Sequence, residues 1–246
     1  MGARPLEPLS GGRRRPRWRA YLLLARVSNL PTIWSNVLAG ALAASGAAAL
    51  PDVDLLLQIA AAVSCFYVGG MFLNDAFDAE FDARTRPERP VPSGDVTRRE
   101  AFAVGGLLLA AGMLALPPGL AILMLGAALA AAILFYDFRH KGDALAPLVM
   151  GACRGLVYLI AGAAVGDVST AVIAGAVLMM AYVVGLTIVA KQAGPAARWL
   201  VPLLIAGISI VDALFIAAVT SSVSLALVAA AGFPLTLLFQ RVIPGD

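Results

Sequence analysis

The sequence of 246 residues is poor in charged side chains, which make up 13% of it, whereas 61% of its residues are hydrophobic. Soluble domains carry about 25% charged residues, so this composition excludes an ordinary soluble protein. One histidine and two cysteines are present, too few for a zinc site or a disulfide framework. Alternating strand patterns of about ten residues are absent, which excludes a transmembrane β-barrel. An all-α integral membrane protein remains.

Long apolar runs are abundant instead, and they predict a polytopic membrane helical bundle of about eight transmembrane helices. Each run is near the length of about 17 to 25 residues that a spanning helix needs. The predicted spans are residues 22–50, 53–74, 101–116, 119–136, 145–166, 170–190, 199–219 and 222–240. We expect residues 20–246 to form a single transmembrane domain. Residues 1–19, rich in Arg, Pro and Gly, are expected to form a flexible basic cytoplasmic tail.

Basic residues predict the orientation of these helices, because cytoplasmic loops carry an excess of Lys and Arg. They gather before the first span and in alternate loops, whereas the loops near Pro51, Pro117, Asp167 and Ser221 carry none. The basic positions are Arg4, Arg13, Arg14, Arg15, Arg17, Arg19, Arg26, Arg84, Arg86, Arg89, Arg98, Arg99, Arg139, Lys141, Lys191, Arg198 and Arg241. The protein is therefore expected in a bacterial-type inner membrane, with both termini on the cytoplasmic side. The net charge of +3 then reflects topology and contact with anionic lipids rather than nucleic-acid binding.

Carboxylates crowd the end of the second predicted span. Asn74, Asp78 and Asp82 follow one another at intervals of four residues, and Asp75 precedes Asp78 by three, so a helix projects all four from one side. Like charges at this spacing repel unless a cation bridges them. Oxygen ligands without His or Cys favour Mg²⁺, which shares its coordination between one or two carboxylates and a phosphate ester.

Arginines follow the carboxylates in the segment Arg86-Pro87-Glu88-Arg89-Pro90. Guanidinium groups suit the phosphate oxygens that a metal leaves free. The alternative is a solvated acidic helix end followed by a basic loop, which residue spacing alone permits.

Two charges lie inside predicted spans, Arg154 and Asp212, where each costs at least about 2.5 kcal/mol. A structural ion pair or a shared polar network is one explanation. The other is that Arg154 points into a substrate cavity. His140 is expected to be solvated, and Cys65 and Cys153, both within spans, to be reduced and structural.

The motif resembles the signature of the UbiA superfamily of intramembrane prenyltransferases. The matching residues are Asn74, Asp75, Asp78, Asp82, Arg89-Pro90 and Pro92-Ser93-Gly94, with weaker support from Arg26, Pro31, Asn36, Tyr136 and Lys141. The segments Asn29–Thr32, Tyr136-Asp137 and Met150–Gly155 look like the EboC-like branch.

The resemblance implies Mg²⁺-dependent transfer of a prenyl group from an allylic prenyl diphosphate to a lipophilic or aromatic acceptor in the membrane. Tyr67, about two turns deeper than Asn74, is a candidate to stabilise an allylic cation, or a packing residue. Asp75, Asp78 and Asp82 are the candidate catalytic residues, and Asn74, Asp78 and Asp82 the candidate metal ligands. The candidate substrate-binding residues are Arg26, Asn36, Tyr67, Arg89, Tyr136, Lys141, Arg154, Lys191 and Arg198.

The sequence departs from the family pattern where a second Asp-rich motif is usual, because no carboxylate lies between Asp167 and Asp212. Lys191 and Arg198 are candidates to contact the diphosphate in its place. Asp137 and Asp143 are further metal candidates, with a solvated turn as the alternative. A ninth helix is not apparent, so the bundle is either open on one side or completed by a partner or a second copy.

Two other functions stay open. A membrane terpene cyclase would ionise the same diphosphate and quench the cation internally. A non-catalytic carrier or scaffold would bind a prenylated lipid, which the missing second motif permits.

Overall fold

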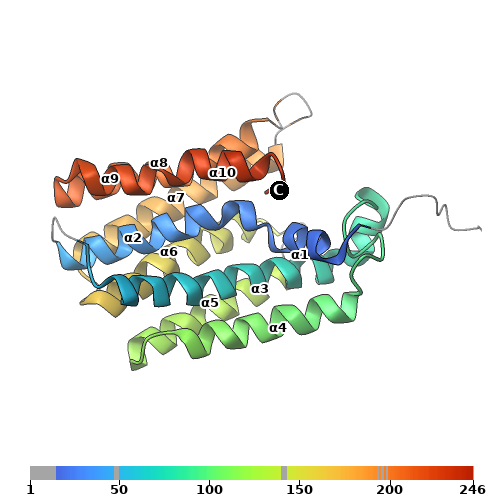
Figure 1. The fold of residues 1–246 in the computed structure, drawn as a ribbon, viewed down its shortest axis with the longest axis horizontal. Helices are drawn as coiled ribbons and strands as arrows, with labels where there is room; N and C mark the ends of the chain where they lie inside the picture. The colour runs from blue at the N-terminus through green and yellow to red at the C-terminus, as the bar shows by residue number, and fades with distance from the viewer. Residues whose placement is uncertain are drawn as a thin grey trace, which may run out of the picture.

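The computed structural model describes residues 15–245, except 47–49, 140–142, 193, 195–196 and 198. Within these residues every regular element is a helix, and the long helices run side by side (Figure 1). Among the described residues, six segments are long and apolar enough to cross a membrane: α3 (Val53–Thr85), α5 (Leu120–Arg139), α6 (Ala146–Val165), α7 (Thr170–Gln192), α8 (Leu200–Thr220) and the α9–α10 segment, Val223–Gln240. The predicted all-α membrane bundle is confirmed, while the count of eight spans stays a prediction.

The first predicted span is not one helix. Helix α1 (Arg17–Ala25) ends at Arg26, whose left-handed backbone (φ 43°) is rare for a residue with a side chain. A short 3₁₀ turn, η1 (Val27–Asn29), leads into α2 (Leu30–Ser45), which has Pro31 in its first turn. Proline favours the start of a helix because its fixed φ suits that position. The predicted tail, residues 1–19, therefore overlaps the start of α1, and residues 1–14 lie outside the described part.

Helix α4 and the last predicted span also differ from simple spanning helices. Helix α4 (Arg98–Ala115) begins with three charged residues, and Thr97 caps it by accepting a hydrogen bond from the Glu100 amide at 3.2 Å. The last span is divided at Ala231 into α9 (Val223–Ala230) and α10 (Gly232–Gln240). Both parts still lie in line along α8 (Figure 1).

Small residues bring the helices together. A Cβ atom on Gly69 would lie 3.0 Å from the carbonyl oxygen of Gly105, where α3 meets α4. A Cβ atom on Gly151 would lie 2.7 Å from the carbonyl oxygen of Met180, where α6 meets α7. Gly106 differs, because nothing lies within 4 Å of its Cβ position. Close backbone approach through small residues is a common source of helix association in membranes.

Replacing Gly40 by alanine is expected to destabilise the contact between α2 and α6. The added Cβ would lie 2.7 Å from the carbonyl oxygen of Tyr158, and this backbone atom cannot move aside alone. Overpacking of this kind costs about 1–3 kcal/mol. Thermal unfolding in detergent measures the loss. Gly185→Ala is the control, since nothing lies within 4 Å of its Cβ position, and equal melting temperatures for the two variants would contradict the prediction.

The connections between the helices lie at the two ends of the bundle. Helix α1, the α3–α4 connection and the C-terminal end of α10 lie at one end, and the α4–α5 turn lies at the other (Figure 1). The arginines that surround the acidic motif therefore gather at a single end of the bundle.

Candidate functional site

The acidic motif lies within α3, in agreement with its helical spacing. The helix continues eleven residues past the predicted end at residue 74, to Thr85. Its 33 residues span about 50 Å at 1.5 Å per residue, more than the roughly 30 Å of a bilayer core. Asn74, Asp75, Asp78 and Asp82 are all buried. The predicted one-sided arrangement of these four groups is therefore present, and the alternative of a solvated acidic helix end does not fit their burial.

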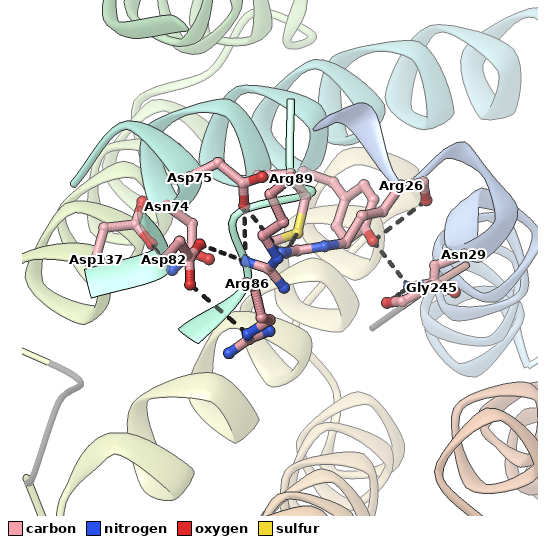
Figure 2. A network of polar contacts seen from close by, with 11 residues as sticks. Arg26, Asn29, Asn74, Asp75, Asp82, Arg86, Arg89, Asp137 and Gly245 are labelled. Atoms are coloured by element: carbon pink, nitrogen blue, oxygen red, sulfur yellow. Dashed lines mark hydrogen bonds and ion pairs between the residues drawn. The ribbon is translucent and has the colours of Figure 1, made fainter. Parts of the chain in front are cut away.

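Arginines from two other segments reach the carboxylates. The Arg89 Nη1 atom lies 2.9 Å from Asp82 Oδ2 and 3.4 Å from Asp75 Oδ1. The Arg26 Nη2 atom donates to Asp75 Oδ1 at 2.9 Å. Figure 2 shows Arg89 between the two carboxylates, with Arg86 beside Asp82. These arginines offset the repulsion that the motif would otherwise create.

A further carboxylate comes from α5. Asn74 Nδ2 donates to Asp137 Oδ1 at 3.3 Å, and Asp137 is 4% exposed. Figure 2 shows the two side chains pointing toward each other. The solvated-turn alternative therefore fails for Asp137, whereas it holds for Asp143, which accepts a hydrogen bond from the Leu145 amide within the turn before α6.

The oxygen chemistry of this site fits Mg²⁺, although arginine occupies part of the space. Asp82 Oδ1 is buried and accepts no hydrogen bond from the described residues, and Arg86 Nε lies 3.6 Å from it. Hard oxygen ligands from Asn74, Asp78 and Asp82 are the kind that Mg²⁺ prefers. In the described residues, no three His, Cys, Asp or Glu side chains converge closely enough to hold a metal. A bound metal would therefore require Arg89 to move from between the carboxylates.

An apolar cavity of about 100 Å³ adjoins the motif inside the bundle, between α2, α3, α5 and α6. Tyr67, Met71, Tyr136 and Arg154 are part of its wall. Arg26 Nη1 contacts Met71 Sδ, so the polar site and the apolar cavity meet at this pair. Tyr67 thus lines a cavity, as its candidate role requires, and its hydroxyl accepts a hydrogen bond from Asn29 Nδ2 at 3.1 Å.

Arg154 and Asp212 belong to a shared polar network, which is one of the two explanations that the sequence left open. Arg154 Nη1 donates to Asn36 Oδ1 at 2.8 Å, and Asn36 Nδ2 donates to Asp212 Oδ2 at 2.7 Å. Thr32 also accepts two hydrogen bonds from Arg154. Since Arg154 also lines the apolar cavity, the network orients a cation toward it. Asn36, a candidate substrate-binding residue, is fully buried and holds Arg154 in place.

The remaining candidates are less defined. Lys191 is exposed in the last turn of α7, and its contact with a diphosphate stays a prediction. Lys141, His140 and Arg198 lie outside the described residues.

A second, much larger cavity of about 1020 Å³ opens beside the acidic motif, and sequence reasoning missed part of its wall. Arg26, Arg89 and Asp75 belong to it, as do Arg15, Arg19 and Arg241, which the sequence analysis assigned only to orientation. For Arg19, the spacing of seven residues from Arg26, which places both on one helical face, was the available signal.

Known proteins resemble this chain in sequence and in fold. Digeranylgeranylglyceryl phosphate synthase of Methanopyrus kandleri is 40% identical over 157 residues, 61% of this chain and 54% of the relative. The 4-hydroxybenzoate octaprenyltransferase of Photobacterium profundum is 33% identical over 147 residues, 56% of this chain and 49% of the relative. The chain therefore spans about half the length of these relatives.

Solved structures share the fold over most of the chain. A digeranylgeranylglyceryl phosphate synthase matches with a TM-score of 0.63 and 20% identity, covering 93% of this chain and 96% of that one. A UbiA homologue from Archaeoglobus fulgidus, bound to DMAPP and Mg²⁺, matches with a TM-score of 0.59 and 14% identity, covering 91% of this chain and 86% of that one. The sequence pattern of the UbiA prenyltransferase family matches residues 32–243. The chain thus belongs to the UbiA prenyltransferase family.

Proposed function

We propose that this protein transfers a prenyl group from an allylic prenyl diphosphate to a lipophilic or aromatic acceptor within the membrane, with Mg²⁺ as cofactor. The observation that carries the proposal is the junction at Arg26 and Met71, where a carboxylate and arginine site opens onto an apolar cavity. A prenyl diphosphate has the same two parts, a polyanionic head and an apolar chain. The names of the curated relatives, a digeranylgeranylglyceryl phosphate synthase and an octaprenyltransferase, support the same reaction.

The polar groups would bind the diphosphate head. Asn74, Asp78 and Asp82 would hold Mg²⁺, which when bound stabilises negative charge on a leaving diphosphate. The guanidinium groups of Arg26 and Arg89 donate charge-assisted hydrogen bonds to the remaining phosphate oxygens. In this arrangement Arg89 exchanges its carboxylate partners for phosphate oxygens, so the positive charge stays beside the leaving group.

The apolar cavity would receive the reactive end of the prenyl chain. Its volume of about 100 Å³ is below the roughly 300–1,000 Å³ of a pocket for a whole ligand, so only part of a chain fits. The C–O bond to the diphosphate breaks with its electron pair leaving on oxygen. The aromatic faces of Tyr67 and Tyr136 stabilise the allylic cation. The nucleophilic atom of the acceptor then bonds to the cation and loses its proton to the released diphosphate.

Incubation of the purified full-length protein with labelled dimethylallyl, geranyl, farnesyl and geranylgeranyl diphosphates tests this function. Each is supplied with and without Mg²⁺ and with a set of lipophilic or aromatic acceptors. A prenylated acceptor formed only with Mg²⁺ is the expected product. A cyclised hydrocarbon formed without acceptor would replace the proposal with a terpene cyclase. Binding without turnover under every condition would replace it with a carrier, which the arginines among the carboxylates also suit.

The location proposed for this chemistry is the cytoplasmic side of a bacterial-type inner membrane. Reporters inserted after Asp95 or Gly194 are expected to be cytoplasmic, and reporters after Gly119 or Asp167 to face the opposite side, because basic loops stay in the cytoplasm. Alkaline phosphatase and green fluorescent protein fusions measure the two outcomes. A reproducible reversal at one site would require a different set of spanning segments.

A further inference from the structure

The larger cavity carries more positive charge than the acidic motif can neutralise. Six arginines and two carboxylates are part of the wall of this cavity of about 1020 Å³. Its volume is at the upper end of the roughly 300–1,000 Å³ range for ligand sites, so there is room beside a diphosphate head. A cleft lined by one sign of charge concentrates ligands of the opposite sign. The cavity is therefore suited to more than one anionic group.

Helix α1 presents arginines to this cavity along one face. Arg19, Leu23 and Arg26 follow at intervals of four and three residues, and all three line the cavity. The opposite face is fixed elsewhere, because Arg17 and Tyr21 both hydrogen-bond to Glu100 at the start of α4. The contact with α4 thus sets the rotation of α1 and keeps its arginine face toward the cavity.

The arginines of the cavity divide into two groups. Four have partners: Arg26, Arg86 and Arg89 pair with the carboxylates of the motif, and Arg15 pairs with Asp95 and with the carbonyl oxygen of Glu88. The side chains of Arg19 and Arg241, both exposed, form no hydrogen bond or ion pair with any residue in the described part of the chain. Arg19 lies seven residues from Arg26, about 10 Å at the rise of a helix, so Arg19 belongs to the outer part of the cavity, away from the carboxylate that Arg26 contacts. Arg241 lines the same cavity from the end of α10.

We propose that Arg19 and Arg241 bind the phosphate group of the acceptor, an amphiphilic phosphate monoester; the proposal rests on the proposed prenyl transfer. Arginine is the preferred partner of phosphate because its planar donors match two oxygens at once. The apolar side chains of Leu23, Val201 and Val242 are also part of the wall and face the lipid part of such an acceptor. The donor diphosphate occupies the inner site at Arg26 and Arg89, and the acceptor phosphate the outer one.

The test compares matched ligands and matched variants. Binding of geranylgeranylglyceryl phosphate and of geranylgeranylglycerol is measured with the full-length protein in uncharged nanodiscs, together with binding of geranylgeranyl diphosphate and Mg²⁺. The variant is Arg19→Gln/Arg241→Gln, with Arg241→Gln alone as a milder form. The control is Arg84→Gln/Arg99→Gln, which removes the same charge from exposed positions that do not line either cavity. Melting temperatures verify that every variant is folded.

The wild type is expected to bind the phosphate at least about tenfold more tightly than the alcohol, the effect of charge-assisted hydrogen bonds. The double variant is expected to lose most of this difference while it binds geranylgeranyl diphosphate unchanged, and the control is expected to keep the difference. Equal binding of phosphate and alcohol by the wild type, or equal losses in variant and control, would overturn the inference. Failure of the wild type to bind geranylgeranyl diphosphate with Mg²⁺ would instead overturn the proposed function.

A further arm identifies the source of the phosphate. Phosphatidylglycerol is added to the nanodiscs, and inorganic phosphate to the buffer, as competitors. The inference expects both to compete at least about tenfold more weakly than geranylgeranylglyceryl phosphate, because neither has a monoester joined to a prenyl chain. If phosphatidylglycerol competes as strongly as the acceptor, the arginines bind bilayer lipid instead. If inorganic phosphate competes as strongly, they bind a free anion instead.

Discussion

Asp82→Ala and Asp78→Ala are each expected to lower Mg²⁺-dependent prenyl transfer by about 100- to 1,000-fold, the cost of removing a group that stabilises charge in a transition state. Both side chains are buried on α3, and the substitutions remove oxygen ligands without removing apolar packing. In Asp82→Ala, Arg89 keeps Asp75 as a partner at 3.4 Å, so insertion and folding are expected to persist. Isothermal titration with a prenyl diphosphate, with and without Mg²⁺, measures binding separately from turnover.

Asp54→Ala provides the control for these variants. Asp54 lies exposed in the first turn of the same helix, far from the motif, so the same chemical change is expected to leave binding unaltered. Wild-type Mg²⁺-dependent binding by both Asp78→Ala and Asp82→Ala would refute the assignment of the metal to this motif.

Asp212→Ala is expected to destabilise the bundle by about 3 kcal/mol, a large part of the roughly 5–15 kcal/mol that stabilises a typical domain. Asp212 is fully buried and accepts hydrogen bonds from Ser35, Asn36 and Tyr158. Alanine leaves these donors without their carboxylate acceptor inside the bundle, and it removes the negative charge that Asn36 links to Arg154. Thermal unfolding in detergent measures the change.

Two comparisons separate the network from a general effect of lost charge. Asp212→Asn keeps an acceptor oxygen and the side-chain shape, so a smaller loss is expected than for alanine. Asp167→Ala removes an exposed carboxylate from the turn between α6 and α7, and no measurable loss is expected. Similar melting temperatures for Asp212→Ala and Asp167→Ala would show that the network contributes nothing to stability.

Much of the architecture follows from local patterns. Apolar run lengths predicted the cores of α3 and α5 through α8, and four-residue spacing predicted that Asn74, Asp78 and Asp82 share one side of a helix. The first span was less predictable, because the break at Arg26 depends on a left-handed backbone that has no signal in hydrophobicity. The predicted apolar span ended at residue 74, but the four-residue spacing already placed Asp82 on the same helix, and α3 continues to Thr85.

The composition of the site was decided by tertiary packing. Asp137 lies 63 residues from Asn74, and Arg26 lies 49 residues from Asp75. Helical periodicity specifies which residues share a face, but not which face of another helix they meet. The sequence therefore contained the acidic motif, its arginines and the side of the membrane on which they are expected. The packing of α1 and α5 against α3 decided which cations reach which carboxylates, because such contacts depend on the rotation and depth of each helix within the bundle.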